Sequence, residues 1–275
     1  MIQRSIKHIK RYGFFHFLIN AINFIFSIVL FTIIRKISSI SAPLFLYNLL
    51  NFRVNLMSDA RKEIMSRVCE GAFKDKDKSL KFLEIGTWFG EGSTKLWIDF
   101  LPKKSQLYLV DSWGKYISDK DTNDSLYYRM VDKIGFQANH HVLKNIYEYE
   151  DQVNNIEIIL LRGKSSSVLK GFKENLFDLV YIDGSHYYDV VNADILAAKN
   201  IVNTKFSIIC GDDLDREINP ELIELANENL DTNFVSGFHP GVVIALNENF
   251  TKVNVENGFW WVYCIDGKYT DTLEV

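Results

Sequence analysis

The chain has 275 residues, a formal net charge of −4 and a pI near 5.9. This length allows one large α/β domain with an appendage, and the ordinary apolar and charged fractions exclude a disordered chain. The acidic balance, without an arginine-rich block among aromatic residues, argues against nucleic acid as a partner. The three cysteines, Cys69, Cys210 and Cys264, are widely spaced. This spacing is typical of buried thiols in a reducing compartment rather than of disulfides or a zinc site.

The first 55 residues form a hydrophobic segment that we expect to be helical and separate from a larger domain at 56–275. Residues 14–34 are an apolar run about as long as a bilayer is thick, with basic residues on both sides. Four polar side chains interrupt this run: His16, Asn20, Asn23 and Ser27. Three structures remain open: a helix in the membrane, a helix lying on its surface, and a helix packed on the domain or on a second copy of the chain in a homo-oligomer.

Beyond the N-terminal segment, apolar strands alternate with amphipathic helices. We expect strands at 82–85, 106–110, 156–162, 177–182, 206–210 and 260–265, with a further one near 242–245 or Phe234. Helical spacing occurs at 57–73, 93–100, 166–172, 190–202 and 220–229. This alternation predicts an α/β fold: a Rossmann-like, mostly parallel sheet of seven strands with helices on both faces. Ligands of such sheets bind at the carboxyl ends of the strands, near the point where the strand order reverses.

One long connection, at 112–152, is rich in aromatic residues. Loops of this length in a compact domain are usually lids or binding loops, and the alternative is a structural insertion. We expect a helix within it at 126–134. The adjacent pair His140 and His141 falls in this segment, on the surface or on the substrate side.

A glycine-rich turn joins the first expected strand to its helix. Residues 82–94 read F-L-E-I-G-T-W-F-G-E-G-S-T, with glycines at 86, 90 and 92. Glycines let a backbone approach a ligand where a Cβ would clash. The next strand ends in Asp111, a suitable partner for ribose hydroxyls. Together they predict a site for a nucleoside-bearing ligand.

A second group of functional residues follows two later strands. Asp183 ends one apolar run and His186 follows three residues later, while Asp212 and Asp213 end the next. Carboxylate oxygens suit a hard cation such as Mg²⁺, and a neutral imidazole can accept a proton near neutral pH. The alternative interpretations are a capped turn for the two adjacent acids and a turn histidine for His186. His239 is a further candidate for contact with a substrate.

The glycine turn resembles the first motif of class I S-adenosylmethionine-dependent methyltransferases, in the segment E-I-G-T-W-F-G-E-G-S. The resemblance implies that S-adenosylmethionine is the cofactor and that Asp111 holds its ribose. The expected cofactor contacts at the turn are Glu84, Gly86, Thr87, Gly90 and Ser93. The segment R-G-K-S-S-S is similar to the family's adenine-side turn, which implies a contact from Ser165. Trp113 either covers the adenine or packs under the long connection.

Residues 80–250 resemble one subgroup of that family, the metal-dependent sugar O-methyltransferases of macrolide and aminocoumarin biosynthesis and cephalosporin-hydroxylase-like relatives. The similar segments are D-L-V-Y-I-D-G-S-H-Y-Y, G-D-D and P-G-V-x-x-A-L. The resemblance implies that Asp183, Asp212 and Asp213 bind Mg²⁺ or another divalent cation and that His186 is the general base. The acceptor would be a small molecule or a glycan, methylated on a sugar hydroxyl. Leu214 departs from the aromatic residue common in relatives, which leaves the shape of the acceptor pocket open.

Three other functions compete with this interpretation. A nicotinamide-dinucleotide oxidoreductase is disfavoured because the glycines do not follow the G-x-G-x-x-G spacing. A non-catalytic scaffold protein is also disfavoured, because it would have no need for Asp183, His186 and the Asp212-Asp213 pair in one group. Metal-assisted methylation of a phenol or another small metabolite uses the same residues and stays open. If residues 14–34 enter a membrane, the domain must face the cytoplasm, where S-adenosylmethionine is made, and would be anchored at the cytoplasmic membrane.

Overall fold

The structure is a computed structural model that describes residues 57–75, 77–114, 117–124, 138–139, 141–149 and 156–273. All of these lie in the second of the chain's two units, Asn55–Val275. The helices are α4 (Asp59–Ala72), α5 (Ser93–Phe100), α6 (Asp119–Asp124), α8 (Ser165–Val168), α9 (Tyr188–Ile201), α10 (Pro220–Asn227) and α11 (Pro240–Asn249). The strands are β1 (Lys81–Ile85), β2 (Gln106–Asp111), β3 (Glu157–Arg162), β4 (Leu179–Ile182), β5 (Phe206–Leu214), β6 (Asn254–Glu256), β7 (Gly258–Ile265) and β8 (Lys268–Thr270).

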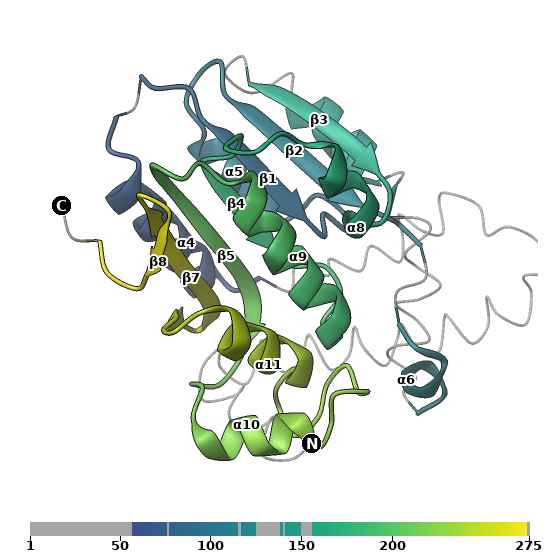
Figure 1. Ribbon diagram of the computed structural model, residues 1–275. Helices are drawn as coiled ribbons and strands as arrows, with labels where there is room; N and C mark the ends of the chain where they lie inside the picture. Colours follow the sequence, from purple (N-terminus) through teal and green to yellow (C-terminus); the bar gives the residue numbers. More distant parts are fainter. Residues whose placement is uncertain are drawn as a thin grey trace, which may run out of the picture. The chain divides into compact units, whose positions relative to one another are not determined.

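The strands form one mostly parallel sheet in the order β3-β2-β1-β4-β5-β7-β6, and β8 pairs with β7 at its edge (Figure 1). The strands β1 to β5 run parallel, whereas β7 is antiparallel to β5, β6 and β8. The order reverses between β1 and β4, since β2 and β3 lie on one side and β5 on the other. The predicted Rossmann-like, mostly parallel sheet is confirmed. Its switch point lies at the carboxyl ends of β1 and β4, where ligands of such sheets bind.

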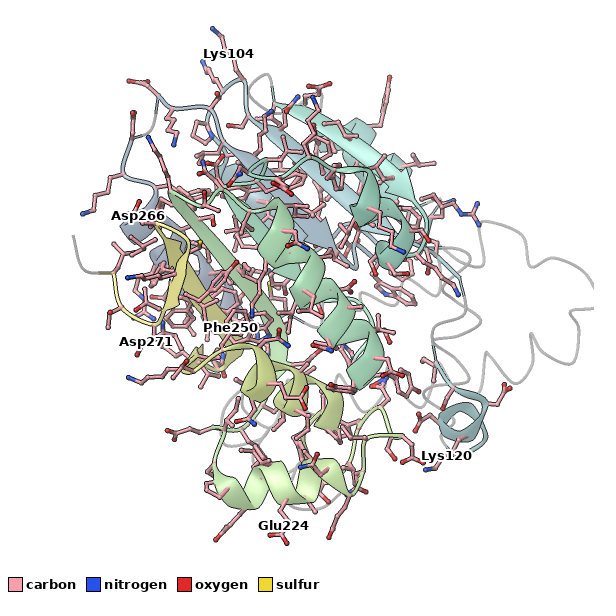
Figure 2. The ribbon with its side chains drawn as sticks, in the orientation of Figure 1. Lys104, Lys120, Glu224, Phe250, Asp266 and Asp271 are labelled. Atoms are coloured by element: carbon pink, nitrogen blue, oxygen red, sulfur yellow. The ribbon has the colours of Figure 1, made fainter. Side chains whose placement is uncertain are left out.

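Helices cover both faces of this sheet. Figure 1 shows α8 and α9 in front of the strands and α4 and α5 behind them. The buried residues of α9 are Val191, Ile195, Ala198 and Ile201, which share one helical face. Every residue of β4 is buried, as expected for a central strand covered on both sides. Charged side chains such as Lys104 and Glu224 instead point away from the ribbon (Figure 2).

One predicted strand is wrong. Residues 242–245 belong to helix α11, which begins at Pro240 and packs on α9 and α10. Pro240 stands at the first helical position, where its fixed φ favours a helix and its missing N–H costs nothing. The run from Pro240 to Leu246 is buried all round, so its hydrophobicity has no period that would separate a buried helix from a buried strand.

The short strands β6 and β8 were not predicted from the sequence. Each forms a hairpin with β7 through a turn, at Asn257-Gly258 and at Asp266-Gly267, and all four turn residues have positive φ. Asn-Gly and Asp-Gly are the dipeptides that such hairpins favour, so the signal was present in the sequence. The helix expected at 126–134 and the segment 14–34 lie outside the described residues. Within the described part, no helix is both long and apolar enough to cross a membrane.

Candidate active site

The glycine-rich turn after β1 lies directly against the end of β4. Gly86 has a φ of +93°, and a Cβ built on it would lie 2.0 Å from the carbonyl oxygen of Asp183. Gly90 has a φ of +70°, and its Cβ would lie 2.6 Å from Cγ2 of Val142. Glycine is required at both positions because of the backbone conformation and the lack of space. The turn predicted to hold a cofactor therefore touches the strand end that carries the predicted chemistry.

Glu84 is fully buried on β1 and joins this strand to the start of α5. Its two carboxylate oxygens accept hydrogen bonds from the hydroxyls of Ser93 (2.6 Å) and Thr94 (2.8 Å). Burial raises the pKa of Glu84 to about 8, although both hydrogen bonds act to lower it. In this structure Glu84 and Ser93, both predicted at the cofactor, hold the turn and the helix together.

Asp111 ends β2 and binds two loop backbones. One carboxylate oxygen accepts a hydrogen bond from the Trp88 amide (2.8 Å) and the other from the Trp113 amide (2.7 Å). Burial raises the pKa of Asp111, and these backbone hydrogen bonds partly offset that rise. The buried indole of Trp113 donates to the Trp88 carbonyl (2.8 Å). Trp113 thus joins the two turns, and its contact with an adenine stays a prediction.

Two buried hydroxyls flank the contact between the turns and have no hydrogen-bond partner within the described part of the chain. They are Oγ1 of Thr87, next to Gly86, and Oγ of Ser185, two residues after Asp183. A buried hydroxyl without a partner costs about 1–3 kcal/mol. The two turns therefore offer hydrogen bonds that a polar ligand could complete, which fits a cofactor site. Ser185 was not predicted, because a single serine in a turn carries no specific signal.

Ser165 is the first residue of α8, just after β3 and Gly163. Its side chain lies near Asp194, a buried residue of α9. Burial raises the pKa of Asp194 to about 6, and the nearby Ser165 hydroxyl acts to lower it. Ser165 thus lies at the carboxyl end of β3, where the adenine-side turn was expected, next to α9.

The predicted acids at the ends of β4 and β5 lie close enough to influence one another. Oδ2 of Asp183 accepts a hydrogen bond from the hydroxyl of Tyr181 (3.1 Å). Burial, followed by repulsion from Asp212 and Asp213, raises the pKa of Asp183 well above its usual value. Carboxylates that destabilise one another in a buried site are typical of a position where a cation binds.

His186 and Asp213 form a close pair. The Nε2 atom of His186 lies 2.8 Å from Oδ2 of Asp213. Burial alone would lower the pKa of His186, but the Asp213 carboxylate raises it to about 9. The same pairing outweighs burial at Asp213 and holds its pKa below the usual range.

Asp213 reaches His186 because strand β5 is irregular at this point. The residue has a φ of +67°, in the left-handed region. The pairing of β5 with β7 shifts between Gly211 and Leu214. Gly211 pairs with Trp260 and Leu214 pairs with Gly258, so this part of β5 has one residue more than the part of β7 that it faces. Such a bulge interrupts the alternation of side chains along a strand and re-aims them.

Asp212 pairs with Arg61, a residue that the sequence analysis did not single out. Its Oδ2 accepts a hydrogen bond from Nη1 of Arg61, which reaches over from α4. The Arg61 Nε atom donates to the carbonyl of Asn257 (3.0 Å). Burial and the neighbouring Asp213 raise the pKa of Asp212 to about 7, with Arg61 acting in the opposite direction. The ion pair is largely buried, and it neutralises one of the three predicted metal ligands.

His239 precedes α11 and completes the group around Asp213. Its Nε2 lies 3.8 Å from Oδ1 of Asp213, and its ring centroid is 4.2 Å from that of His186. Burial and the charge of His186 lower the pKa of His239 to about 4. One ligand atom from each of His186, Asp213 and His239 lies within 4.8 Å of the others, a spacing that could hold a metal ion. Asp213 belongs both to this group and to the predicted set of three acids.

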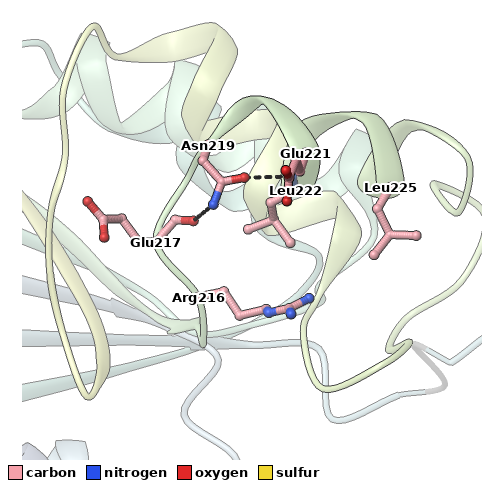
Figure 3. A pocket seen from close by; sticks show the side chains of 6 residues that line it. All are labelled: Arg216, Glu217, Asn219, Glu221, Leu222 and Leu225. Atoms are coloured by element: carbon pink, nitrogen blue, oxygen red, sulfur yellow. Dashed lines mark hydrogen bonds between the residues drawn. The ribbon is translucent and has the colours of Figure 1, made fainter.

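A hollow of about 160 Å³ lies at α10, beside the loop that follows β5 (Figure 3). Its lining is Arg216, Glu217, Asn219, Glu221, Leu222 and Leu225. None of these is a predicted site residue, and Asn219 caps α10 by accepting from the Leu222 amide (2.9 Å). The hollow therefore has no lining residue in the glycine-rich turn. Of the paired histidines in the long connection, His141 contacts Phe89, with ring centroids 5.4 Å apart, and His140 lies outside the described residues.

Residues 83–214, from β1 to the end of β5, match the model of a family described as a methyltransferase domain. This segment of the chain is a methyltransferase domain. The matched segment contains the glycine turn of the methyltransferase, Asp111, Asp183, His186 and both acids of β5. No curated protein sequence matches the chain.

Several solved structures are similar to this methyltransferase at low identity. The PH0226 protein of Pyrococcus horikoshii is 17% identical over 74% of this chain and 88% of that one, with a TM-score of 0.41. A SAM-dependent methyltransferase of Aquifex aeolicus is 12% identical over 78% and 92%, with a TM-score of 0.40. An O-methyltransferase of Bacillus cereus in complex with SAH is 13% identical over 85% and 97%, with a TM-score of 0.43.

Proposed function

We propose that this methyltransferase transfers the methyl group of S-adenosylmethionine to a hydroxyl oxygen of a sugar or glycan, assisted by Mg²⁺ or another divalent cation. The observation that carries the proposal is the contact between the Gly86 turn and the backbone of Asp183. A methyl donor bound on that turn would lie next to the group of Asp183, His186 and Asp213. In this proposal the cofactor and the acid–base residues share one edge of the sheet.

The cofactor would bind along the carboxyl ends of β1, β2 and β3. The turn from Gly86 to Gly90 would bring backbone amides to the ligand. The buried hydroxyls of Thr87 and Ser185, which have no hydrogen-bond partner within the described residues, could also bond to it. Asp111 would accept hydrogen bonds from the ribose, in addition to those from two backbone amides. Ser165, at the carboxyl end of β3 and near Asp194, would contact the adenine.

The residues around Asp213 suit a divalent cation, because ligand atoms of His186, Asp213 and His239 lie within 4.8 Å of one another and because burial and repulsion from Asp212 and Asp213 raise the pKa of Asp183. Asp183, Asp212 and Asp213 would hold it, and carboxylate oxygens favour Mg²⁺. When bound, the cation would lower the pKa of the acceptor hydroxyl. Arg61 already balances one of the acids, so the site carries less net negative charge than three carboxylates suggest.

His186 would take the proton of the acceptor hydroxyl at Nε2. The oxygen would then form a bond to the methyl carbon, and the bond from that carbon to sulfur would break to release S-adenosylhomocysteine. A general base must be neutral, whereas the pair with Asp213 raises the pKa of His186 to about 9. To act as the base, His186 must therefore become neutral. This requires that a second positive group also interact with Asp213 during the reaction and so weaken its effect on the pKa of His186.

The proposal is tested with labelled S-adenosylmethionine and a panel of nucleotide-sugars, glycosides and catechol, each with and without chelator. We expect label in a sugar-containing product, loss of transfer in chelator and recovery with Mg²⁺. Asp213→Asn should remove transfer while leaving S-adenosylhomocysteine binding in place, because Asp213 lies with the acid–base group and not on the turn. Labelling of catechol alone would favour a phenol as the acceptor, and full activity in chelator would contradict the role of the acids.

A further inference from the structure

Asn233 contacts both imidazoles of the site. It lies in the connection between α10 and α11, six residues before His239, and is 1% exposed. Its side-chain oxygen lies 3.1 Å from Nδ1 of His186, and its backbone oxygen lies 2.7 Å from Nδ1 of His239. One residue thus binds the same nitrogen in two different histidines.

These contacts decide where the imidazole protons lie. A carbonyl oxygen can only accept a hydrogen bond, so Nδ1 carries a proton in both rings, whether or not Nε2 is also protonated. Nε2 is then the atom that each ring presents to Asp213, at 2.8 Å for His186 and 3.8 Å for His239. Without a fixed acceptor at Nδ1, an imidazole can rotate or exchange tautomers, and the reactive nitrogen is no longer defined.

Asn233 is itself held by a small network. The backbone amide of Asn233 donates a hydrogen bond to Oδ2 of Asp121 (3.3 Å), a residue of α6. The same oxygen accepts hydrogen bonds from the hydroxyls of Ser118 (2.9 Å) and Tyr187. Tyr187 directly follows His186 in the chain, so Asn233 is tied to the histidine both through its side chain and through this network.

We propose that Asn233 is the positioning residue of the site: its two carbonyl oxygens fix His186 and His239 with Nε2 directed at Asp213. Its effect on turnover rests on the proposed function, in which His186 accepts a proton at Nε2. The placement of the two rings is independent of that function and can be measured in the absence of an acceptor.

The experiment uses the full chain labelled with ¹⁵N-histidine and bound to S-adenosylhomocysteine, with Asn233→Ala and Asn233→Asp as variants. Hydrogen-bonded Nδ1–H protons give slowly exchanging NMR signals, which His186→Gln and His239→Gln would assign. Asn233→Ala removes the side-chain oxygen but keeps the backbone oxygen. We therefore expect the His186 signal to disappear while the His239 signal remains. Asn233→Asp, which keeps an acceptor oxygen, should retain both signals.

With an acceptor from the panel above, Asn233→Ala should lower kcat by about 10- to 100-fold, the usual cost of removing a partner that orients an imidazole. The KM for S-adenosylmethionine should stay unchanged, and Asn233→Asp should recover part of kcat. A persistent His186 signal in Asn233→Ala would overturn the proposal. So would the joint loss of both signals and of S-adenosylhomocysteine affinity, since that pattern indicates a purely structural role. If no acceptor is methylated, the proposed function fails, while the NMR signals still decide the position of the rings.

Discussion

Replacing Gly86 with alanine tests whether the glycine-rich turn depends on its close approach to β4. The new Cβ would lie 2.0 Å from the Asp183 oxygen, 2.4 Å from its carbonyl carbon and 2.6 Å from the Gly184 nitrogen. All three are backbone atoms, so no side chain can rotate away. The ends of β1 and β4 would have to separate by more than about 1 Å to restore van der Waals distances. That shift would disturb the hydrogen bond from the Asp183 amide to the Ile85 carbonyl (2.8 Å).

Two costs add in this variant. An alanine held at the φ of +93° found for Gly86 is strained by about 1–3 kcal/mol. Loss of a buried backbone hydrogen bond adds about 1–3 kcal/mol. Together they amount to about 2–6 kcal/mol, a large part of the 5–15 kcal/mol typical of a folded domain.

Gly184→Ala is the matched control, in the loop that Gly86 contacts. Its Cβ would meet only ordinary contacts, 3.6 Å from Cγ2 of Ile85 and 3.9 Å from its carbonyl oxygen. Urea unfolding gives the stability of both variants, and titration calorimetry gives their affinity for S-adenosylhomocysteine. We expect Gly86→Ala to lose stability and affinity and Gly184→Ala to keep most of both. If the two variants unfold at the same urea concentration and bind the ligand equally, the reasoning from close approach is refuted.

Three further outcomes are expected. Because the pKa of Glu84 is raised from 4.5 to about 8 in the folded state, the folded chain should lose stability as pH rises through that interval, and Glu84→Gln should flatten this part of a urea-unfolding series. Arg61→Ala leaves Asp212 buried without its partner and should destabilise by about 3–5 kcal/mol. Arg67→Ala, which breaks an exposed ion pair, should cost about 0–1 kcal/mol by the same assay, and equal losses would contradict the difference in burial. If residues 14–34 enter a membrane, the full chain should sediment with membranes after a high-salt wash, whereas a chain beginning at residue 51 should not.

The chemistry-bearing strand ends could be predicted because parallel strands place their carboxyl ends at one edge. Asp111, Asp183 and Asp212 each stand at the end of a mainly apolar run, and all three lie at that edge in the structure. The glycine turn was recognisable for a similar local reason, since Gly86 and Gly90 adopt positive φ. Local pattern and sheet topology were sufficient for this part of the site.

The partners of these residues could not be predicted in the same way. Arg61 meets Asp212 across a separation of 151 residues, and its helix shows no feature that singles out this arginine. Asn233 acts through carbonyl oxygens, one of which belongs to the backbone and is the same in every residue type. Contacts of this kind depend on how elements pack in three dimensions, which hydrophobic periodicity does not encode.

The irregular end of β5 has a consequence for transplanting this site into another protein. In a regular strand two adjacent acids point to opposite faces of the sheet. A designer who grafts only the Gly-Asp-Asp sequence onto a regular strand would thus place one carboxylate on the wrong face. The additional residue relative to β7 and the left-handed backbone of Asp213 must be copied as well. Aspartate and asparagine tolerate that backbone better than most residues, and of the two only aspartate brings the negative charge that pairs with His186.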